Sequence, residues 1–493
     1  MSTRLSVRHG LAGRLNLLTD EQIEAIHVST LEVLQNTGVQ VLSASARELL
    51  KDTGAEIDLE KKIVRFPPYL VEEALNKCPS SVTLYGRNPK LFCQFENDWI
   101  NFGVSGGPPN ILDLEGERRT ATFNDVADHC RLADALEHIH VGGCDIVGTI
   151  EESSLPPRLA QLESAFIRVK NTEKPCVFEP YGGPPDDIIE FCAIIRGGLD
   201  NLRKYPMGWA WSNPLSPLIH EEGMTDQVIA YAQRGLPVMF ASAIMAGMSG
   251  PVTLAGALVQ QNAEILSGIV IAQMAADPKH RPPVFYGCAS DAIDLKMAQP
   301  ALGGPEAALL NIAAAQLAKY YQLPCRGTGG CTDSKIPDGQ AGYESAMGSF
   351  AAALAGINYI YNAAGGLEPG VLAVSFEKLV MDNDSLGYLI RILSGISIEK
   401  DTLSVDLINQ VGPGGNYLKT KHTRQFFQQE IYFPTIFNRQ GFGAWKESGG
   451  KNVRKLAQEK ARELLASYFP EPLEPELEKE LQGFIQKIRD ENV

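Results

Sequence analysis

The sequence predicts an α/β protein built around an eight-stranded (β/α)8 TIM barrel, with an N-terminal helical segment and a C-terminal helical extension. Two observations support this prediction. Apolar runs of about five residues alternate with helical stretches of 12 to 25 residues, and several runs open just after a proline, which is tolerated at a strand's first position. The eight predicted strands are Ile100–Val104, Ile139–Gly143, Cys176–Glu179, Met207–Trp211, Val238–Ser242, Val284–Gly287, Pro324–Gly327 and Asn358–Asn362.

The repeats divide the chain into three parts. Residues 1–95 form the predicted N-terminal helical segment, in which Thr19 caps a helix that ends at Gly38. Residues 96–400 form the barrel, because eight strand–helix repeats over about 300 residues fit a closed ring better than an open sheet. Residues 401–493 form the extension, with helices predicted over 453–468 and 475–488.

The helices between the strands carry start signals. Thr122 and Asp125 resemble a capping box with Asp in place of the usual Glu. The sequence also places prolines where a first-turn proline would open a helix, at Pro157, Pro185, Pro251 and Pro305.

Composition excludes several classes of protein. Lys and Arg total 44 against 59 Asp and Glu, a formal charge of −15, so a nucleic-acid partner is not expected. No run of 18 apolar residues predicts a membrane span, and the N-terminus lacks a secretory signal. The nine cysteines form no C-x-x-C pair and the histidines no zinc spacing, so we expect no metal site, reduced thiols and a cytoplasmic location. No nucleotide-binding loop occurs in a fitting context.

Aromatic residues gather where the predicted strands end, and active sites of such barrels lie at the strands' carboxyl ends. Aromatic faces attract a quaternary ammonium, which cannot donate a hydrogen bond, and a carboxylate can add to this attraction. Because strand residues alternate between two faces, any one of these rings can instead pack in the core. The candidates are Phe178, Glu179 and Tyr181 after the third strand, Trp209 and Trp211 in the fourth, Tyr286 in the sixth and Tyr361 in the eighth.

The seventh strand leads into the densest polar stretch, from Arg326 to Lys335. Its glycines allow the backbone to approach a ligand, while Arg326 or Lys335 can meet a substrate carboxylate. Asp333 is the candidate catalytic carboxylate in this stretch, beside Glu179 in the third strand.

Several short motifs, in order along almost the whole chain, resemble the trimethylamine methyltransferase family, including members without pyrrolysine. The matching pieces are Gly107-Pro108-Pro109-Asn110, Thr332-Asp333-Ser334-Lys335 with Gln340-Ala341-Gly342, Gly365-Gly366-Leu367-Glu368, Gly414-Gly415-Asn416-Tyr417-Leu418 with His422-Thr423, Arg439 and Trp445. The resemblance implies a barrel enzyme that passes a methyl group from an amine to Co(I) of cobalamin carried by a separate corrinoid protein. Because His422 belongs to one of these motifs, the resemblance makes it a candidate substrate-binding residue.

The chain contains only standard amino acids, whereas trimethylamine enzymes contain pyrrolysine. A quaternary substrate fits this difference, because its nitrogen stays cationic at every pH and leaves as a neutral tertiary amine without a general acid. The protein then mainly positions and desolvates the cation. Glycine betaine is the favoured substrate because Arg or Lys can hold its carboxylate; proline betaine and carnitine are the alternatives.

Two other readings remain open from sequence alone, because barrels host many chemistries. One is a lyase or aldolase acting on a small carboxylate, with Lys335 as a Schiff-base former. The other is a non-catalytic betaine-binding protein. For each reading we expect a homo-oligomer, with the helices after Asp401 as the contacts.

Overall fold

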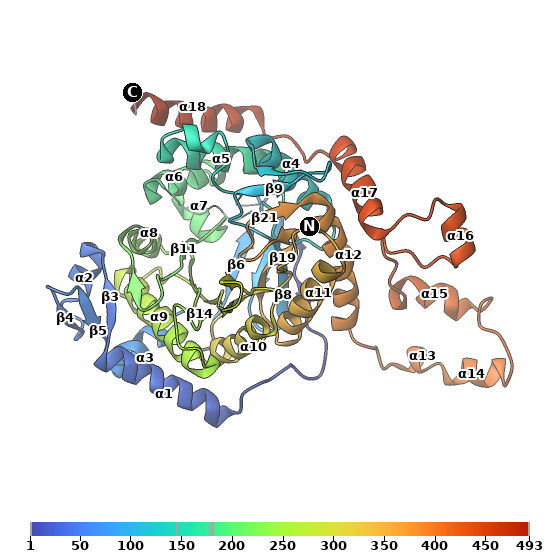
Figure 1. The fold of residues 1–493 in the computed structure, drawn as a ribbon, viewed down its shortest axis with the longest axis horizontal. Helices are drawn as coiled ribbons and strands as arrows, with labels where there is room; N and C mark the ends of the chain where they lie inside the picture. Colours follow the sequence, from blue (N-terminus) through green and yellow to red (C-terminus); the bar gives the residue numbers. More distant parts are fainter. Residues whose placement is uncertain (1, 144–145, 177, 179–181, 492–493) are drawn as a thin grey trace.

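The structure, a computed structural model, describes residues 2–143, 146–176, 178 and 182–491 (Figure 1). At its centre lies a sheet whose strands run parallel except for β2, which is antiparallel to β8 at one edge. The order across the sheet is β11 (Ala210–Ser212), β13 (Val238–Ser242), β15 (Val284–Cys288), β18 (Cys325–Thr328), β19 (Tyr359–Ala364), β8 (Trp99–Val104) and β2 (Val7–Arg8).

Six of the eight predicted strands are formed as continuous strands. The other two are reduced to isolated parallel bridges, which continue the sheet from β8 to Val141 and from Gly142 to Cys176. The next neighbour in a closed ring would be β11. A Cβ built on Gly208 would lie 2.6 Å from the carbonyl oxygen of Phe178, so these two segments lie side by side. No ladder between Cys176 and β11 is formed by the described residues, and closure of the ring stays a prediction.

Helices surround the sheet in Figure 1 and cover its outer face. The predicted capping box at Thr122 and Asp125 is confirmed, and Pro157, Pro185 and Pro305 open helices as expected. The expectation for Pro251 is wrong, because its helix begins later, at Leu254. The helices are α4 (Phe123–Ala135), α5 (Pro157–Asn171), α6 (Pro185–Arg196), α7 (Leu199–Lys204), α8 (Glu222–Gln233), α9 (Leu254–Ala275), α10 (Pro305–Tyr320), α11 (Gly339–Leu354) and α12 (Phe376–Leu393).

One helix, α9, is long and apolar enough to cross a membrane by length and composition alone. Of its most apolar window, however, 72% is buried inside the protein, where α9 packs against α1, α3 and α8 as well as β13. A helix enclosed on all sides is apolar all round, so its composition follows from its central position.

A β-hairpin closes the N-terminal end of the sheet's inner face. It consists of β6 (Val82–Tyr85) and β7 (Leu91–Phe95), and β1 (Thr3–Arg4) pairs with β7. The buried side of the hairpin forms one apolar cluster with side chains from the central strands. A pocket on the inner face can therefore open only at the carboxyl ends of the strands.

The N-terminal segment contains more than the predicted helices. Its helices α1 (Asp20–Asn36), α2 (Ala44–Leu50) and α3 (Pro68–Asn76) all pack against α9. Between them lies a small sheet in the order β12 (Ile219–His220), β3 (Val39–Val41), β5 (Ile63–Arg65) and β4 (Glu56–Asp58). Its strands are short, which is why the sequence pattern underestimates them.

The C-terminal extension has two unlike parts. Two helices return to the body: α17 (Val453–Ser467) packs on α12 and α4, and α18 (Pro475–Glu491) packs on α5 and α6. Between α12 and α17 the chain projects to one side of the molecule in Figure 1. This projecting part contains α13 (Lys400–Leu403), α14 (Val405–Val411), α15 (Lys421–Glu430) and α16 (Phe442–Glu447), none of which has a buried residue.

Candidate active site

An aromatic layer fills the inner face of the sheet near the N-terminal ends of its strands. The Phe95 ring lies 6.1 Å from Trp209, 5.2 Å from Phe285 and 5.6 Å from Tyr359 between ring centroids, in edge-to-face contacts. A Cβ at Gly103 would lie 2.7 Å from the Tyr359 ring, so this layer needs glycine there. Trp209 is 0% exposed. It packs in this layer, its Nε1 has no hydrogen-bond partner among the described residues, and its role in substrate binding stays a prediction.

A second layer lies two residues further along the same strands. Trp211 and Tyr361 are partly exposed, and their ring centroids are 5.2 Å apart. The guanidinium of Arg326 lies over both rings, 5.0 Å from the Trp211 centroid and 4.8 Å from that of Tyr361. These three predicted substrate-binding residues are therefore brought together, and the rings hold a protein cation between them.

Among the described residues, Arg326 is buried without a matching negative charge. Only 2% of the residue is exposed, and burial lowers the pKa of its guanidinium. Its Nη1 donates a hydrogen bond to the Cys288 carbonyl oxygen, while its Nε has no hydrogen-bond partner. Within the described part of the chain, no Asp or Glu forms an ion pair with it. A buried cation of this kind is costly unless an anion joins it, so this position favours an anionic ligand group.

A pocket of about 850 Å³ lies at the carboxyl end of the sheet and contains the predicted Asp333 and Lys335. It is bordered by the hairpin of β16 (Asp291–Asp294) and β17 (Gln299–Pro300) and by the turn between β20 (Gly366–Leu367) and β21 (Ala373–Ser375). Arg118 closes one side through a two-pronged ion pair with Glu368, at 2.6 and 3.0 Å. The pocket therefore combines charged and apolar walls.

Two carboxyl groups at this rim, those of Asp333 and Asp291, have raised pKa values. Burial raises the pKa of Asp333, with a further increase from the charge of Glu344. The Asp333 amide donates to Glu344 Oε2 at 2.8 Å. Burial, and next the charge of Asp333, raise the pKa of Asp291 to about 7. Both shifts favour the protonated carboxyl, and a cation bound nearby would restore the charged form.

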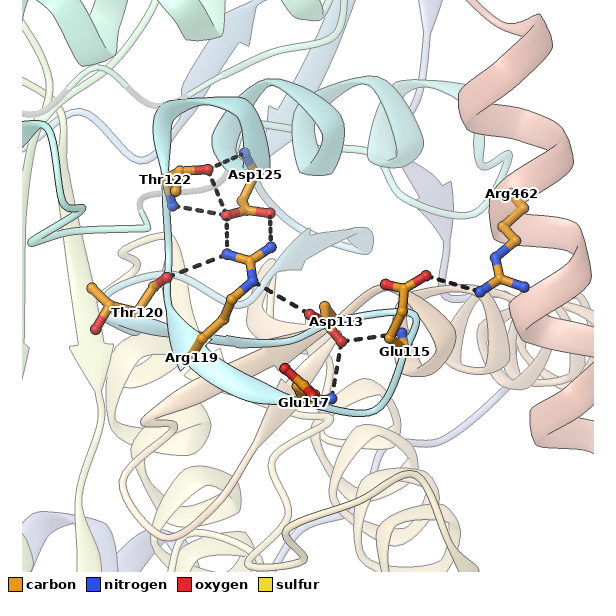
Figure 2. A network of polar contacts seen from close by, with 8 residues as sticks. All are labelled: Asp113, Glu115, Glu117, Arg119, Thr120, Thr122, Asp125 and Arg462. Atoms are coloured by element: carbon orange, nitrogen blue, oxygen red, sulfur yellow. Dashed lines mark hydrogen bonds and ion pairs between the residues drawn. The ribbon is translucent and has the colours of Figure 1, made fainter.

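A polar network fixes the hairpin that carries Arg118 (Figure 2). The hairpin consists of β9 (Asn110–Leu112) and β10 (Arg118–Thr120). Arg119 donates to both oxygens of Asp125, at 2.7 and 2.9 Å, and to Asp113 at 3.3 Å. Glu115 in the turn pairs with Arg462 of α17 at 3.0 Å. Burial opposes ionisation of Asp125, but hydrogen bonds from Arg119 and Thr122 prevail and lower its pKa.

Two predicted aromatic residues face the helices and not the inner face. The Tyr286 hydroxyl donates to Asn262 of α9 at 3.0 Å, and its ring packs near Tyr321, the residue just after α10. Phe178 packs against Phe191 of α6 and beneath the Arg168 guanidinium of α5. Both predictions are wrong because strand neighbours point to opposite faces.

One further predicted residue, His422, lies away from the sheet. His422 belongs to α15 in the projecting part, where its Nε2 lies 2.8 Å from Ser404 Oγ. Within one chain it does not lie on the inner face of the sheet, which corrects that prediction. Glu179 and Tyr181 lie outside the described residues. Among the described residues, no cluster of three or more His, Cys, Asp or Glu side chains is arranged to hold a metal ion.

Sequence reasoning missed the residues that form the floor of the site. Phe95 comes from a hairpin in the segment predicted to be helical. In the sixth strand the predicted site residue is Tyr286, whereas the structure places its neighbour Phe285 in the aromatic layer. A signal for Phe95 exists, because Leu91 to Phe95 is an extended apolar run opposite a second one at Val82. For Phe285 the strand is apolar on both faces, and no alternation distinguishes inner from outer residues.

A parallel sheet covered by helices, with a pocket at the carboxyl ends of its strands, is the architecture of many α/β enzymes. Residues 4–492 match the family model described as trimethylamine methyltransferase (MTTB). The chain belongs to this family.

Relatives extend over almost the whole chain. It is 36% identical to a glycine betaine methyltransferase of Desulfitobacterium hafniense (strain Y51), covering 96% of this chain and 97% of the relative. It is 34% identical to a trimethylamine methyltransferase of Desulfitobacterium hafniense (strain DSM 10664 / DCB-2), with coverages of 98% and 95%. The trimethylamine methyltransferase of Methanosarcina thermophila is 36% identical, with coverages of 95% and 96%. The crystal structure of the Methanosarcina barkeri monomethylamine methyltransferase superposes with a TM-score of 0.45 at 11% identity, covering 93% of this chain and 96% of that one.

Proposed function

We propose that this chain transfers a methyl group from a small quaternary amine bearing a carboxylate, with glycine betaine favoured, to Co(I) of a corrinoid protein. The methyl–nitrogen bond breaks, the nitrogen keeps the electron pair and leaves as a neutral tertiary amine, and the methyl carbon bonds to cobalt. The cobalamin belongs to the separate partner protein and acts as the methyl acceptor. The proposal includes a closed (β/α)8 barrel, a cytoplasmic location and a homo-oligomer.

The buried Arg326, which forms no ion pair within the described part of the chain, is the observation that carries the choice of substrate. Its Nε donor has no partner, and its guanidinium is held by Trp211 and Tyr361 at the level where a pocket would open. A carboxylate bound there supplies the missing anion and gains charge-assisted hydrogen bonds. Trimethylamine has no such group. The relative at 36% identity that is named for glycine betaine supports the same choice.

The carboxyl groups at the rim fit the other end of the molecule. Asp333, with Asp291 behind it, adds negative charge at the carboxyl ends of the strands, and Glu179 is the second proposed carboxylate. Their proposed role is to attract and position a permanent cation, since its departure as an amine needs no proton. Proline betaine and carnitine share the required groups and remain alternative substrates.

The test mixes the purified chain with cobalamin reduced to Co(I) and follows the methylcobalt(III) spectrum. Substrates are glycine betaine, proline betaine, carnitine, choline and trimethylamine, of which the last two lack a carboxylate. We expect methylation with one or more of the first three. Arg326→Met should abolish it, whereas Arg203→Met, on the outer helix α7, should not. Unchanged Co(I) with every quaternary amine refutes methyl transfer, and equal rates with choline refute the carboxylate requirement.

A further inference from the structure

The projecting part between α12 and α15 exposes far more apolar surface than a solitary chain usually retains. We call residues 394–430 the arm. None of them is buried. Ile396 is 81% exposed, Leu418 76% and Ile398 69%. Exposed apolar side chains that gather in one segment mark an interaction site in many proteins. Its other exposed large apolar residues are Leu403, Val405, Ile408, Tyr417 and Phe427.

The arm is nevertheless an organised unit. Glu399 and Thr402 form a capping box on α13, and Thr420 caps α15. Ser404 Oγ and His422 Nε2 lie 2.8 Å apart and connect the junction of α13 and α14 to α15. Between these helices lies a hollow of about 860 Å³. The arm therefore presents a shaped surface, and its last residue, Glu430, connects it to α12 through an ion pair with Arg391 at 2.8 Å.

A receiving surface lies on α11 and α12 of the body. Tyr343, Met347 and Phe350 of α11 are 77%, 71% and 40% exposed and follow one another at helical spacing, so they form one apolar stripe. Phe350 and Ile392 of α12 border an apolar cavity of about 280 Å³. We call the stripe and this cavity the α11 face. The cavity accepts one or two large side chains but no folded domain.

The two surfaces are continuous in each chain. Ile392 in the last turn of α12 borders the cavity, and the arm begins two residues later at Ser394. Figure 1 shows the arm pointing away from α11 of the same chain. A chain with adjoining projecting and receiving surfaces can pair with a second copy through two equivalent contacts about a twofold axis. A stable interface uses roughly 20–30 residues from each side, which the arm alone can supply.

Charge favours a second copy of this chain as the occupant. The whole arm has four acidic and four basic side chains and is neutral, whereas the whole chain carries −15. Its part from Leu407 to Gln429 has three basic side chains, Lys419, Lys421 and Arg424, and no acidic one. This part of the arm is thus attracted to the acidic body of another copy. We propose that two copies exchange arms, each arm binding the α11 face of its partner. The proposal deepens the homo-oligomer of the proposed function and does not depend on methyl transfer.

Light scattering coupled to size-exclusion chromatography on the full chain tests the exchange. The arm variant is Ile396→Asp with Ile398→Asp, and the face variant is Tyr343→Asp with Met347→Asp. The control is Leu59→Asp with Leu295→Asp, two leucines that are 67% and 73% exposed elsewhere. We expect the unmodified chain and the control to assemble. The arm and face variants should each move to a smaller species at the same concentration, with unchanged far-ultraviolet circular dichroism.

Mixing the arm variant with the face variant sharpens the test. Their mixed pair retains one intact contact, between the unmodified arm of one chain and the unmodified α11 face of the other. We expect native mass spectrometry to detect this mixed pair, and neither variant to pair with itself. A monomeric unmodified chain, assembly that survives both variants, or dispersal of both without a mixed pair would each overturn the exchange. The masses are independent of activity, so a failed methyl-transfer assay leaves this result readable.

Discussion

Replacing Asp291 by Asn should stabilise the protein, and increasingly so as the pH rises. Asp291 is 5% exposed at the start of β16, and burial together with the charge of Asp333 raises its pKa from an ordinary 3.8 to about 7. Between these two values the folded protein holds a proton that the unfolded chain has released. The free energy of unfolding therefore falls as the pH rises from 3.8 to about 7, and the full decrease is present above about pH 7.

The magnitude follows from the pKa difference. An increase from 3.8 to about 7, at about 1.4 kcal/mol per pKa unit, corresponds to about 4 kcal/mol as an upper value. Asn keeps the shape of the side chain and cannot ionise. Asp291→Asn should thus match the unmodified chain near pH 4 and exceed its free energy of unfolding by up to about 4 kcal/mol at pH 8.

Urea denaturation of both proteins at several pH values between 4.5 and 8, about the window of the cited pKa values, measures this difference. Subtracting the two curves removes the other titrating groups, which both proteins share. The control is Asp52→Asn, since Asp52 is exposed in a turn. A stability difference between Asp291→Asn and the unmodified chain that stays constant over this range would refute the reasoning.

Three further predictions concern the aromatic layers and the polar network. Arg326→Met should raise the free energy of unfolding of the ligand-free protein by roughly 1–4 kcal/mol, because it replaces a buried cation that has no ion-pair partner among the described residues. The same variant should bind glycine betaine more weakly in calorimetry. A variant less stable than the unmodified chain would contradict the first expectation. Trp209→Ala should cost about 3–5 kcal/mol in urea denaturation because it empties the core layer, and a cost below 1 kcal/mol would show that this layer is loosely packed. Arg119→Met should lower the melting temperature near pH 7, because Asp125 loses its partner. This loss should shrink only as the pH falls below the ordinary 3.8 and through the lowered pKa of Asp125; an equal loss at pH 7 and well below pH 3.8 would contradict the ion pair.

Much of the fold follows from the sequence, because strand runs and helix starts are local signals. Val238–Ser242 is found with both predicted ends, and Thr122 caps its helix as expected. The runs at Ile139–Gly143 and Cys176–Glu179 were predicted with equal force, although the described residues there form only single bridges. Pairing depends on the neighbouring strand, which a local pattern does not contain.

The site could be predicted only in part, for a related reason. Trp211, Tyr361 and Arg326 were predicted and do meet on the inner face. Tyr286 and Phe178 belong to runs that are apolar on both sides, so the sequence offers no parity signal for them. The arm is a different case. Its helix α15 carries apolar residues as α18 does, but within one chain α18 buries some of its residues and α15 buries none.

Under the proposed function, Arg326 acts against some substrates as well as for others. A simple cation bound in place of the betaine would meet this buried guanidinium charge between Trp211 and Tyr361. Two positive charges about 5 Å apart repel by about 3 kcal/mol at an effective dielectric constant of about 20, which is a discrimination of roughly 100-fold or more. A betaine relieves this repulsion because its own carboxylate lies next to the arginine. Choline and protonated trimethylamine have nothing to offset it, so one buried charge selects zwitterions by attraction and excludes simple cations by repulsion.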